Sequence, residues 1–344
     1  MRRRKLSMTH EPKLAAYVIE LKPSNSSIEN SNRQLFRYKI GDILSEDLED
    51  SFIFIEMCRL FIASIDTDEM YSDTVSKKCL TANQIDLEND DVNTTIRFHS
   101  EQFIIEGVVE GGKYGKKRNK TFTENKAVKD VVSEKDAITD DFYFLLYCPL
   151  SSKKSILLLQ SYTDDSIDAV MKKFWKNFLS FPTTFNHPRI SKYVPERIIN
   201  DFKNSATISN FTYTTDMPGE TLLQSVSHTE NQNFKITIKI EPTKNGVNME
   251  DLENIIAPIE EATFKSFPLG MFNRKKGTLK DSSTGKTTPF ELDNNFEIKP
   301  SIVLSKYISI NHDESDFERI KDYSFKILED LKKEIFLQNA VHER

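Results

Sequence analysis

Apolar residues recur along the chain in patterns that predict both strands and helices. The segments Phe142–Cys148 and Ile156–Tyr162 are almost continuously apolar, which is typical of strands covered on both faces of a sheet. Only a short polar connection separates them, so we expect an antiparallel pair. Apolar residues at helical spacing follow, which predicts a helix over residues 165–181 directly after this pair.

Further patterns predict elements on either side of this unit. Ala15–Lys22 and Leu35–Leu44 are predicted as strands, and Phe52–Ile65 is long enough for a buried helix. Phe234–Glu241 alternates apolar and polar residues, which indicates a strand with one face in water. Phe317–Ile335 carries apolar residues on one helical face, so we expect an amphipathic terminal helix there.

These elements predict an α+β fold, made mostly of antiparallel sheet with packed helices, in two closely associated units. A length of 344 residues exceeds one average domain. The segment 182–195 contains three prolines and no periodicity, which favours a boundary there. We therefore expect a flexible tail over residues 1–13, an N-terminal α/β domain over 14–181 and a C-terminal α+β domain over 196–344 that ends in the amphipathic helix.

Composition restricts the cellular compartment expected for the protein and the kinds of partner it is expected to have. Hydrophobic residues form 38% of the chain, which is enough for a packed core. No apolar run reaches the roughly 18 uncharged residues of a membrane helix, and the basic start Met1–Lys5 lacks the apolar run of a signal peptide. The three cysteines are far apart, which favours a reducing compartment. We expect a cytoplasmic protein without a membrane partner.

The net charge of −6 is unusual for a non-specific nucleic-acid binder, because phosphate binding favours a basic excess. Binding of DNA or RNA would therefore need a local basic patch. Two clusters qualify, and we expect both to be loops, one beside several glycines and the other within Gly270–Lys286. The residues predicted to contact nucleic acid are Lys113, Tyr114, Lys116, Lys117, Arg118, Lys120, Arg274, Lys275, Lys276 and Lys280. Their cations would meet phosphates, and Tyr114 would stack on a base.

A second pattern is found in metal-dependent nucleases. Glu297-Ile-Lys299 lies on a predicted strand, and Asp281 and Asp293 precede it. In nucleases of the PD-(D/E)xK type, two carboxylates hold a divalent metal and a lysine stabilises the attacking water and the phosphate charge. Mg²⁺ would be the cofactor under this hypothesis. Otherwise we expect no catalytic residue, no cofactor and no metal site, since the histidines and cysteines lack the local pairing of a zinc site.

The order of features over residues 107–160 adds one further indication. Glycine-punctuated strands over Glu106–Gly115 precede an acidic stretch with Asp136-Ala137, and the apolar segments Phe142–Pro149 and Ile156–Ser161 follow. In this order the chain resembles uncharacterised bacterial proteins associated with mobile elements and phage-defence neighbourhoods. The resemblance covers about a sixth of the chain and carries over no functional residue. It implies a bacterial, defence-related role.

The preferred function is binding. We expect a non-enzymatic or accessory subunit of a bacterial phage-defence or mobile-element system, which contacts DNA or RNA through the basic loops. The metal-dependent nuclease is the first alternative. The second is a protein–protein assembly subunit, which would contact another protein subunit or a second copy of itself and no nucleic acid.

Overall fold

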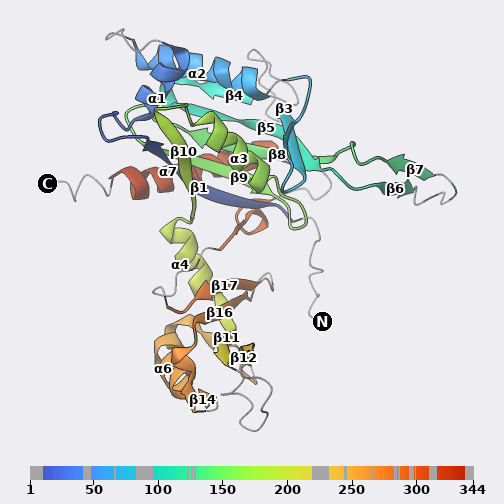
Figure 1. Ribbon diagram of the computed structural model, residues 1–344, viewed down its shortest axis with the longest axis vertical. Helices are drawn as coiled ribbons and strands as arrows, with labels where there is room; N and C mark the ends of the chain where they lie inside the picture. The colour runs from blue at the N-terminus through green and yellow to red at the C-terminus, as the bar shows by residue number, and fades with distance from the viewer. Residues whose placement is uncertain are drawn as a thin grey trace. The chain divides into compact units, whose positions relative to one another are not determined.

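A computed structural model shows the chain as two compact units (Figure 1). The first combines Met1–Pro195 with Ser301–Arg344, and the second is Glu196–Pro300. Every strand pair among the described residues is antiparallel, which confirms the α+β class with a mostly antiparallel sheet. The residues that the structure describes are 11–41, 48–65, 67–82, 96–121, 124, 127, 129–218, 232–243, 246–264, 266–282, 285, 287–293, 298, 300–309 and 316–337.

The first unit is built on a nine-stranded sheet. Its strands follow the order β10 (Phe185–Tyr193), β1 (Lys13–Pro23), β9 (Lys154–Ser161), β8 (Ile138–Tyr147), β5 (Ile104–Lys113), β3 (Lys78–Ala82) and β2 (Tyr71–Asp73), with β18 (Ile302–Val303) paired to β1 and β4 (Ile96–His99) paired to β5. The middle strands β8 and β9 are buried on both faces, for example at Leu145, Leu146, Leu157 and Leu158. This burial confirms the two predicted apolar strands and their antiparallel pairing.

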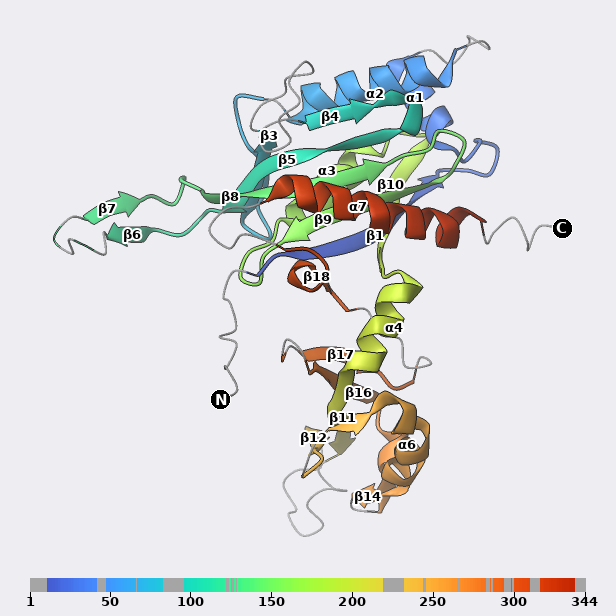
Figure 2. The same cartoon turned by 180° about the vertical axis from the view of Figure 1, so that it is seen from behind.

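Helices cover both faces of this sheet (Figure 1, Figure 2). α1 (Asn32–Ile40), α2 (Asp50–Ile65) and α3 (Asp168–Phe178) pack on one face, and α7 (Phe317–Lys332) packs on the other. On the first face the only tryptophan of the chain, Trp175, stacks on Phe61 with ring centroids 5.3 Å apart. Large aromatic rings contribute most of the hydrophobic stabilisation of such a core, because each buries a large apolar area. Among the described residues, no helix is both long and apolar enough to cross a membrane.

The prediction of a strand at Leu35–Leu44 is wrong for the described residues. Residues 35–40 form part of helix α1, and Gly41 caps that helix. Ser31 begins this helix by accepting a hydrogen bond from the Gln34 amide (3.1 Å), and Gly41 ends it in a left-handed conformation with φ of 76°. The buried side chains of the helix recur at helical spacing: Asn32, Leu35 and Phe36. Packing of this face against the core therefore selects the helix.

The middle of the chain differs from the predicted boundary. α3 is shorter than the predicted helix 165–181, because Ile167 precedes its first turn and Leu179 follows its last. Most of the predicted boundary 182–195 forms β10, an edge strand that pairs with β1. The first part of unit 1 nevertheless ends at Pro195, before α4 (Glu196–Ser205) begins the second unit.

The end of the chain corrects the predicted domain 196–344. Residues 301–337 return to the first unit, because β18 pairs with β1 and α7 packs against β8 and β9. α7 buries Ile320, Ile327 and Leu331 on one helical face, which confirms the predicted amphipathic helix. This helix therefore belongs to the domain that begins the chain.

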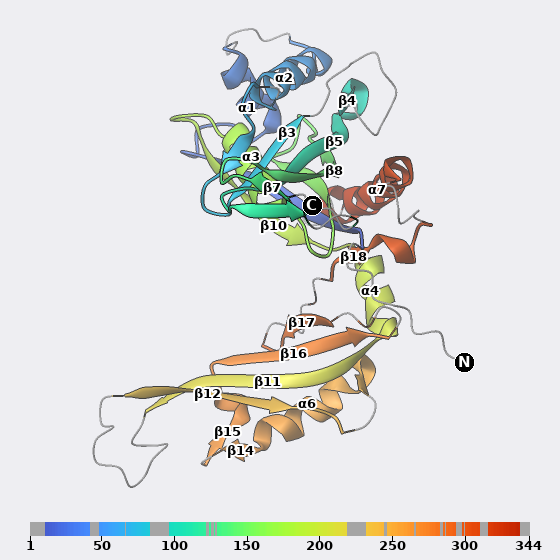
Figure 3. The same ribbon diagram turned by 90° about the vertical axis from the view of Figure 1, so that its right-hand side faces the viewer.

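The second unit is an antiparallel sheet with a helix on one face (Figure 3). Its elements are β12 (Asn233–Ile240), β11 (Ala206–Pro218), β16 (Arg274–Asp281), β17 (Thr287–Glu291), the short β13 (Val247–Asn248) and α6 (Leu252–Glu261). β12 exposes every second residue, which confirms that predicted strand. β16 corrects the loop predicted over Gly270–Lys286, since exposed residues alternate with buried Gly277, Leu279 and Asp281. That alternation is typical of a strand with one wet face.

The ladder between β5 and β8 runs from Ile104↔Tyr147 to Lys113↔Ile138 without a break. Near its outer end the two backbones approach closely. A Cβ atom on Gly112 would lie 1.8 Å from the carbonyl oxygen of Ile138, so only glycine fits there without a backbone shift.

We predict that Gly112→Ala lowers the free energy of unfolding by about 1–3 kcal/mol, the usual cost of overpacking a filled site. Gly41→Asn is the control, because a Cβ at Gly41 meets nothing within 4 Å and asparagine tolerates a left-handed backbone. We expect a change below about 0.5 kcal/mol for the control. Urea unfolding followed by Trp175 fluorescence measures both variants. Wild-type stability of Gly112→Ala would contradict the close approach of the two strands.

Candidate functional site

The β5–β8 ladder continues outward into a two-stranded ribbon. Beyond Lys113↔Ile138, the Gly115 amide donates to the Glu134 carbonyl (3.0 Å), and β6 (Arg118–Thr121) then pairs with β7 (Lys129–Val132). Figure 1 and Figure 2 show β6 and β7 beyond the ends of β5 and β8. We name residues 113–136 the basic arm. The first predicted basic loop is therefore partly a strand of this arm.

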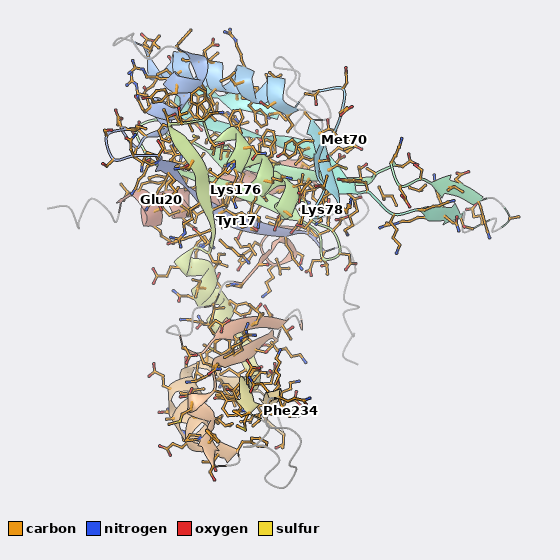
Figure 4. All side chains as sticks on the ribbon, in the orientation of Figure 1. Tyr17, Glu20, Met70, Lys78, Lys176 and Phe234 are labelled. Carbon is orange, nitrogen blue, oxygen red and sulfur yellow. The ribbon has the colours of Figure 1, made fainter. Side chains whose placement is uncertain are left out.

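The basic arm carries positive charge within an acidic chain. Residues 113–136 contain eight Lys or Arg against four Asp or Glu, whereas the whole chain has a net charge of −6. All residues of β6 are exposed. Figure 4 shows the side chains of β6 and β7 projecting from the ribbon into the surroundings. The arm therefore presents a local positive potential to a partner.

Two of the predicted contact residues hold the base of the arm instead of facing a partner. The Nζ atom of Lys113 lies 3.2 Å from Oδ1 of Asp165 and donates a hydrogen bond to the Asp164 carbonyl (3.0 Å). The Lys77 ammonium lies 5.7 Å from the ring centroid of Tyr114. Lys77 thus occupies one face of the ring that would stack on a base.

The next cations along the arm are differently placed. Lys116, Lys117 and Arg118 are exposed, and none of them has a carboxylate within ion-pair distance among the residues that the structure describes. Lys120 is exposed as well. Cations that no neighbouring acid neutralises retain their full charge for an external anion.

The second basic cluster lies on β16, in the other unit, and two of its four cations pair with acids. Lys275 pairs with Glu260 (3.5 Å) and Asp293 (3.1 Å), and only 13% of its side chain is exposed. Lys276 pairs with Glu291 across the ladder (3.0 Å). The remaining cations of the cluster are exposed: Arg274 and Lys280. The structure thus leaves this cluster with less uncompensated charge than its sequence indicates.

Asp281 and Asp293, the two alternative partners of Glu297 in the nuclease pattern, lie apart from each other. Asp281 is buried at the end of β16, whereas Asp293 pairs with Lys275 near the start of that strand. At the usual rise of a strand these positions lie roughly 20 Å apart, too far to share one metal ion. The other two residues of the pattern, Glu297 and Lys299, lie outside the described residues, so the pairing of Glu297 with either aspartate stays a prediction. Within the described ranges, no group of three or more His, Cys, Asp or Glu could hold a metal ion.

A buried polar group that the sequence patterns did not predict lies on the α7 side of the first sheet. Glu106 on β5 is fully buried, and its Oε1 atom lies 3.4 Å from Nε2 of His99 on β4. In the described part of the chain, neither its Oε2 atom nor the Tyr143 hydroxyl has a hydrogen-bond partner. Gln160 accepts a hydrogen bond from the Tyr143 amide (2.9 Å). One sequence signal would have revealed this group, a single charge within the apolar run Ile104–Val109.

Two buried side chains of the first unit, Tyr143 and Cys148, are not activated as nucleophiles. Burial raises the pKa of Tyr143 well above its usual value, and the nearby Glu106 carboxylate raises it further, although the hydroxyl lies outside hydrogen-bond geometry with that carboxylate. Burial also raises the pKa of the Cys148 thiol to about 12. Both groups stay protonated at neutral pH, so neither is an activated nucleophile.

Comparison with known proteins assigns no family. No protein-family model matches the chain, and comparisons with curated proteins and with solved structures found no match. The resemblance to phage-defence proteins therefore stays a prediction. The case for a function depends on the geometry of the basic arm.

We predict that Tyr143→Phe keeps the free energy of unfolding within about 0.5 kcal/mol of wild type or raises it, because the substitution removes a buried hydroxyl that lacks a partner. Tyr17→Phe is the matched control, since Tyr17 (Figure 4) donates to Oδ2 of Asp168 (2.8 Å) from a buried ring. We expect a loss of about 1–2 kcal/mol for the control. Urea unfolding compares the two. A larger loss for Tyr143→Phe would mean that its hydroxyl is hydrogen-bonded in solution.

Proposed function

We propose that the protein binds nucleic acid through the basic arm, as a non-enzymatic or accessory subunit of a bacterial phage-defence or mobile-element system. One observation carries this proposal. Lys116, Lys117 and Arg118 are consecutive exposed cations on a projecting ribbon, without an acidic partner among the described residues. A polyanion is the partner that such a surface attracts most strongly.

The shape of the arm supports a duplex as the partner. A two-stranded β-ribbon fits the major groove of B-DNA, which is about 12 Å wide. Cations along a ribbon in the groove reach the phosphates on its rims. The arm contains more lysine than arginine, and lysine contacts phosphate as a point charge without reading base edges. We therefore expect binding that depends little on sequence.

An assembly subunit without nucleic-acid contact is the second candidate. Val131 on β7 favours it, because this apolar side chain is 58% exposed. β6 and β7 form a two-stranded sheet of their own, and the open edge of such a sheet is a template for a strand of another chain. A second copy of the protein would fit this edge.

We predict that Lys116→Gln/Lys117→Gln/Arg118→Gln weakens binding to a short DNA duplex. The plot of log affinity against log salt should become less steep: the magnitude of its negative slope should decrease by about 2.7, since each lost phosphate contact removes about 0.9. Fluorescence anisotropy with a labelled duplex, measured between about 50 and about 200 mM salt, gives this slope. An unchanged slope would contradict a role of these cations in binding.

The matched control is Arg274→Gln/Lys276→Gln/Lys280→Gln, which makes the same change of charge on β16. We expect this control to lose less affinity for the duplex than the arm variant, because Glu291 already neutralises Lys276. If the control loses more duplex affinity than the arm variant, the result would indicate that the second unit, and not the basic arm, contains the binding surface. Absence of duplex binding, together with self-association that Val131→Lys abolishes, would favour the assembly subunit.

A supercoiled plasmid tests the non-enzymatic part of the proposal. We expect the plasmid to stay intact with the protein and Mg²⁺ while its mobility is retarded. Metal-dependent cleavage that Glu297→Ala abolishes would instead establish the nuclease alternative.

A further inference from the structure

A pocket of about 320 Å³ opens between helices of the first unit. It lies among α1, α2, α3 and β2 and shares no residue with the basic arm. Its wall is mostly apolar, with contributions from Leu60, Phe174 and Phe178. Concave sites of this size with an apolar wall and few polar groups are typical of small-molecule binding.

Lys39, near the end of α1, is the one cation among the residues that line the pocket. Its Nζ atom lies 5.0 Å from the ring centroid of Phe178. In the described part of the chain, no carboxylate lies within ion-pair distance of this atom. Burial lowers the pKa of Lys39, because removal from water disfavours the charged form. A ligand anion would supply the counter-charge that the protein itself does not.

Tyr71 on β2 provides a second polar contact at the pocket. Its hydroxyl oxygen accepts a hydrogen bond from Nδ2 of Asn177 (2.8 Å). Because the oxygen is the acceptor in that bond, the hydroxyl proton remains a donor for a ligand. The pocket thus combines an ammonium group and a hydroxyl donor with an aromatic wall, a set that matches a carboxylate attached to an apolar ring.

The volume sets the size of the ring system. An apolar cavity of about 150 Å³ holds a benzene molecule. The pocket measures about 320 Å³, roughly twice that volume. Two fused aromatic rings therefore fill it, and aromatic rings pack favourably on side chains such as Phe174 and Phe178.

We propose that this pocket, which we name the Lys39 pocket, binds a small aromatic carboxylate with two fused rings. The carboxylate pairs with the Lys39 ammonium and accepts from the Tyr71 hydroxyl, while the rings lie against Phe174 and Phe178. This site is independent of nucleic-acid binding by the basic arm. It gives the first unit a second, small-molecule ligand.

Isothermal titration calorimetry with 2-naphthoate and its neutral analogue 2-naphthalenemethanol tests the proposal. We expect wild type to bind 2-naphthoate more tightly than the alcohol. Lys39→Met removes the cation but keeps an apolar chain of similar length, so it should weaken 2-naphthoate by about 10- to 100-fold, the value of a charge-assisted contact. The affinity for 2-naphthalenemethanol should stay unchanged. Lys22→Met, on the exposed end of β1, is the matched control and should leave both affinities at the wild-type level.

Three results would overturn the proposal. They are the absence of 2-naphthoate binding by wild type, equal affinities of wild type and Lys39→Met for 2-naphthoate, and an equal loss of both ligands in Lys39→Met. The last result would mean that Lys39 supports only the shape of the pocket.

A measurement on the unmodified protein locates the site even if Lys39→Met fails to fold. The single tryptophan, Trp175, lies next to the pocket wall, with its ring centroid 5.3 Å from that of Phe174 and 5.5 Å from that of Phe178. The one indole N–H resonance in a ¹⁵N–¹H spectrum should therefore shift as 2-naphthoate is added. A stationary indole resonance at saturating 2-naphthoate would place the ligand elsewhere and contradict the proposal.

Discussion

The antiparallel ladder between β5 and β8 is the constraint on which the rest of the structure depends. Its inner pairs, beginning at Ile104↔Tyr147, lie in the core, and its last pair, Lys113↔Ile138, lies where the ribbon leaves the sheet. An isolated two-stranded ribbon is at best marginally stable in water. The basic arm therefore depends on this continuity, since burial of the inner pairs fixes the register of the exposed ones. Gly112 permits the close approach at the transition.

The two faces of this sheet bury different polar groups. The face under α1, α2 and α3 holds a large apolar cluster together with the buried, mutually hydrogen-bonded side chains of Asn32 and Ser155, and the Lys39 pocket lies between those helices. The face under α7 contains the buried side chains of Glu106 and Gln160. Because residues 196–300 form a separate unit, the helix that covers this second face joins the sheet across a long interval of sequence. Contacts so distant in sequence cost chain entropy before they stabilise the fold.

Strong local patterns predicted the elements whose burial is continuous or strictly periodic, namely β8, β9, α2 and α7. α1 was not predicted, because Leu35 and Phe36 fit a strand as well as a helix until packing decides. The cations Lys116–Arg118 could be found because they are neighbours in sequence. The pairing of Lys275 with acids of other elements could not, and the lining of the Lys39 pocket comes from segments scattered along the chain.

Amide hydrogen exchange with and without a DNA duplex tests the central claim most directly, because it locates contact along the unmodified chain. We expect the duplex to slow exchange in residues 114–121 and 129–136, where the ribbon extends from the sheet, and to leave residues 206–218 and 274–281 of the second unit unchanged. Slower exchange in those two strands, with no change in the arm, would contradict the claim that the β5–β8 ladder presents the nucleic-acid surface.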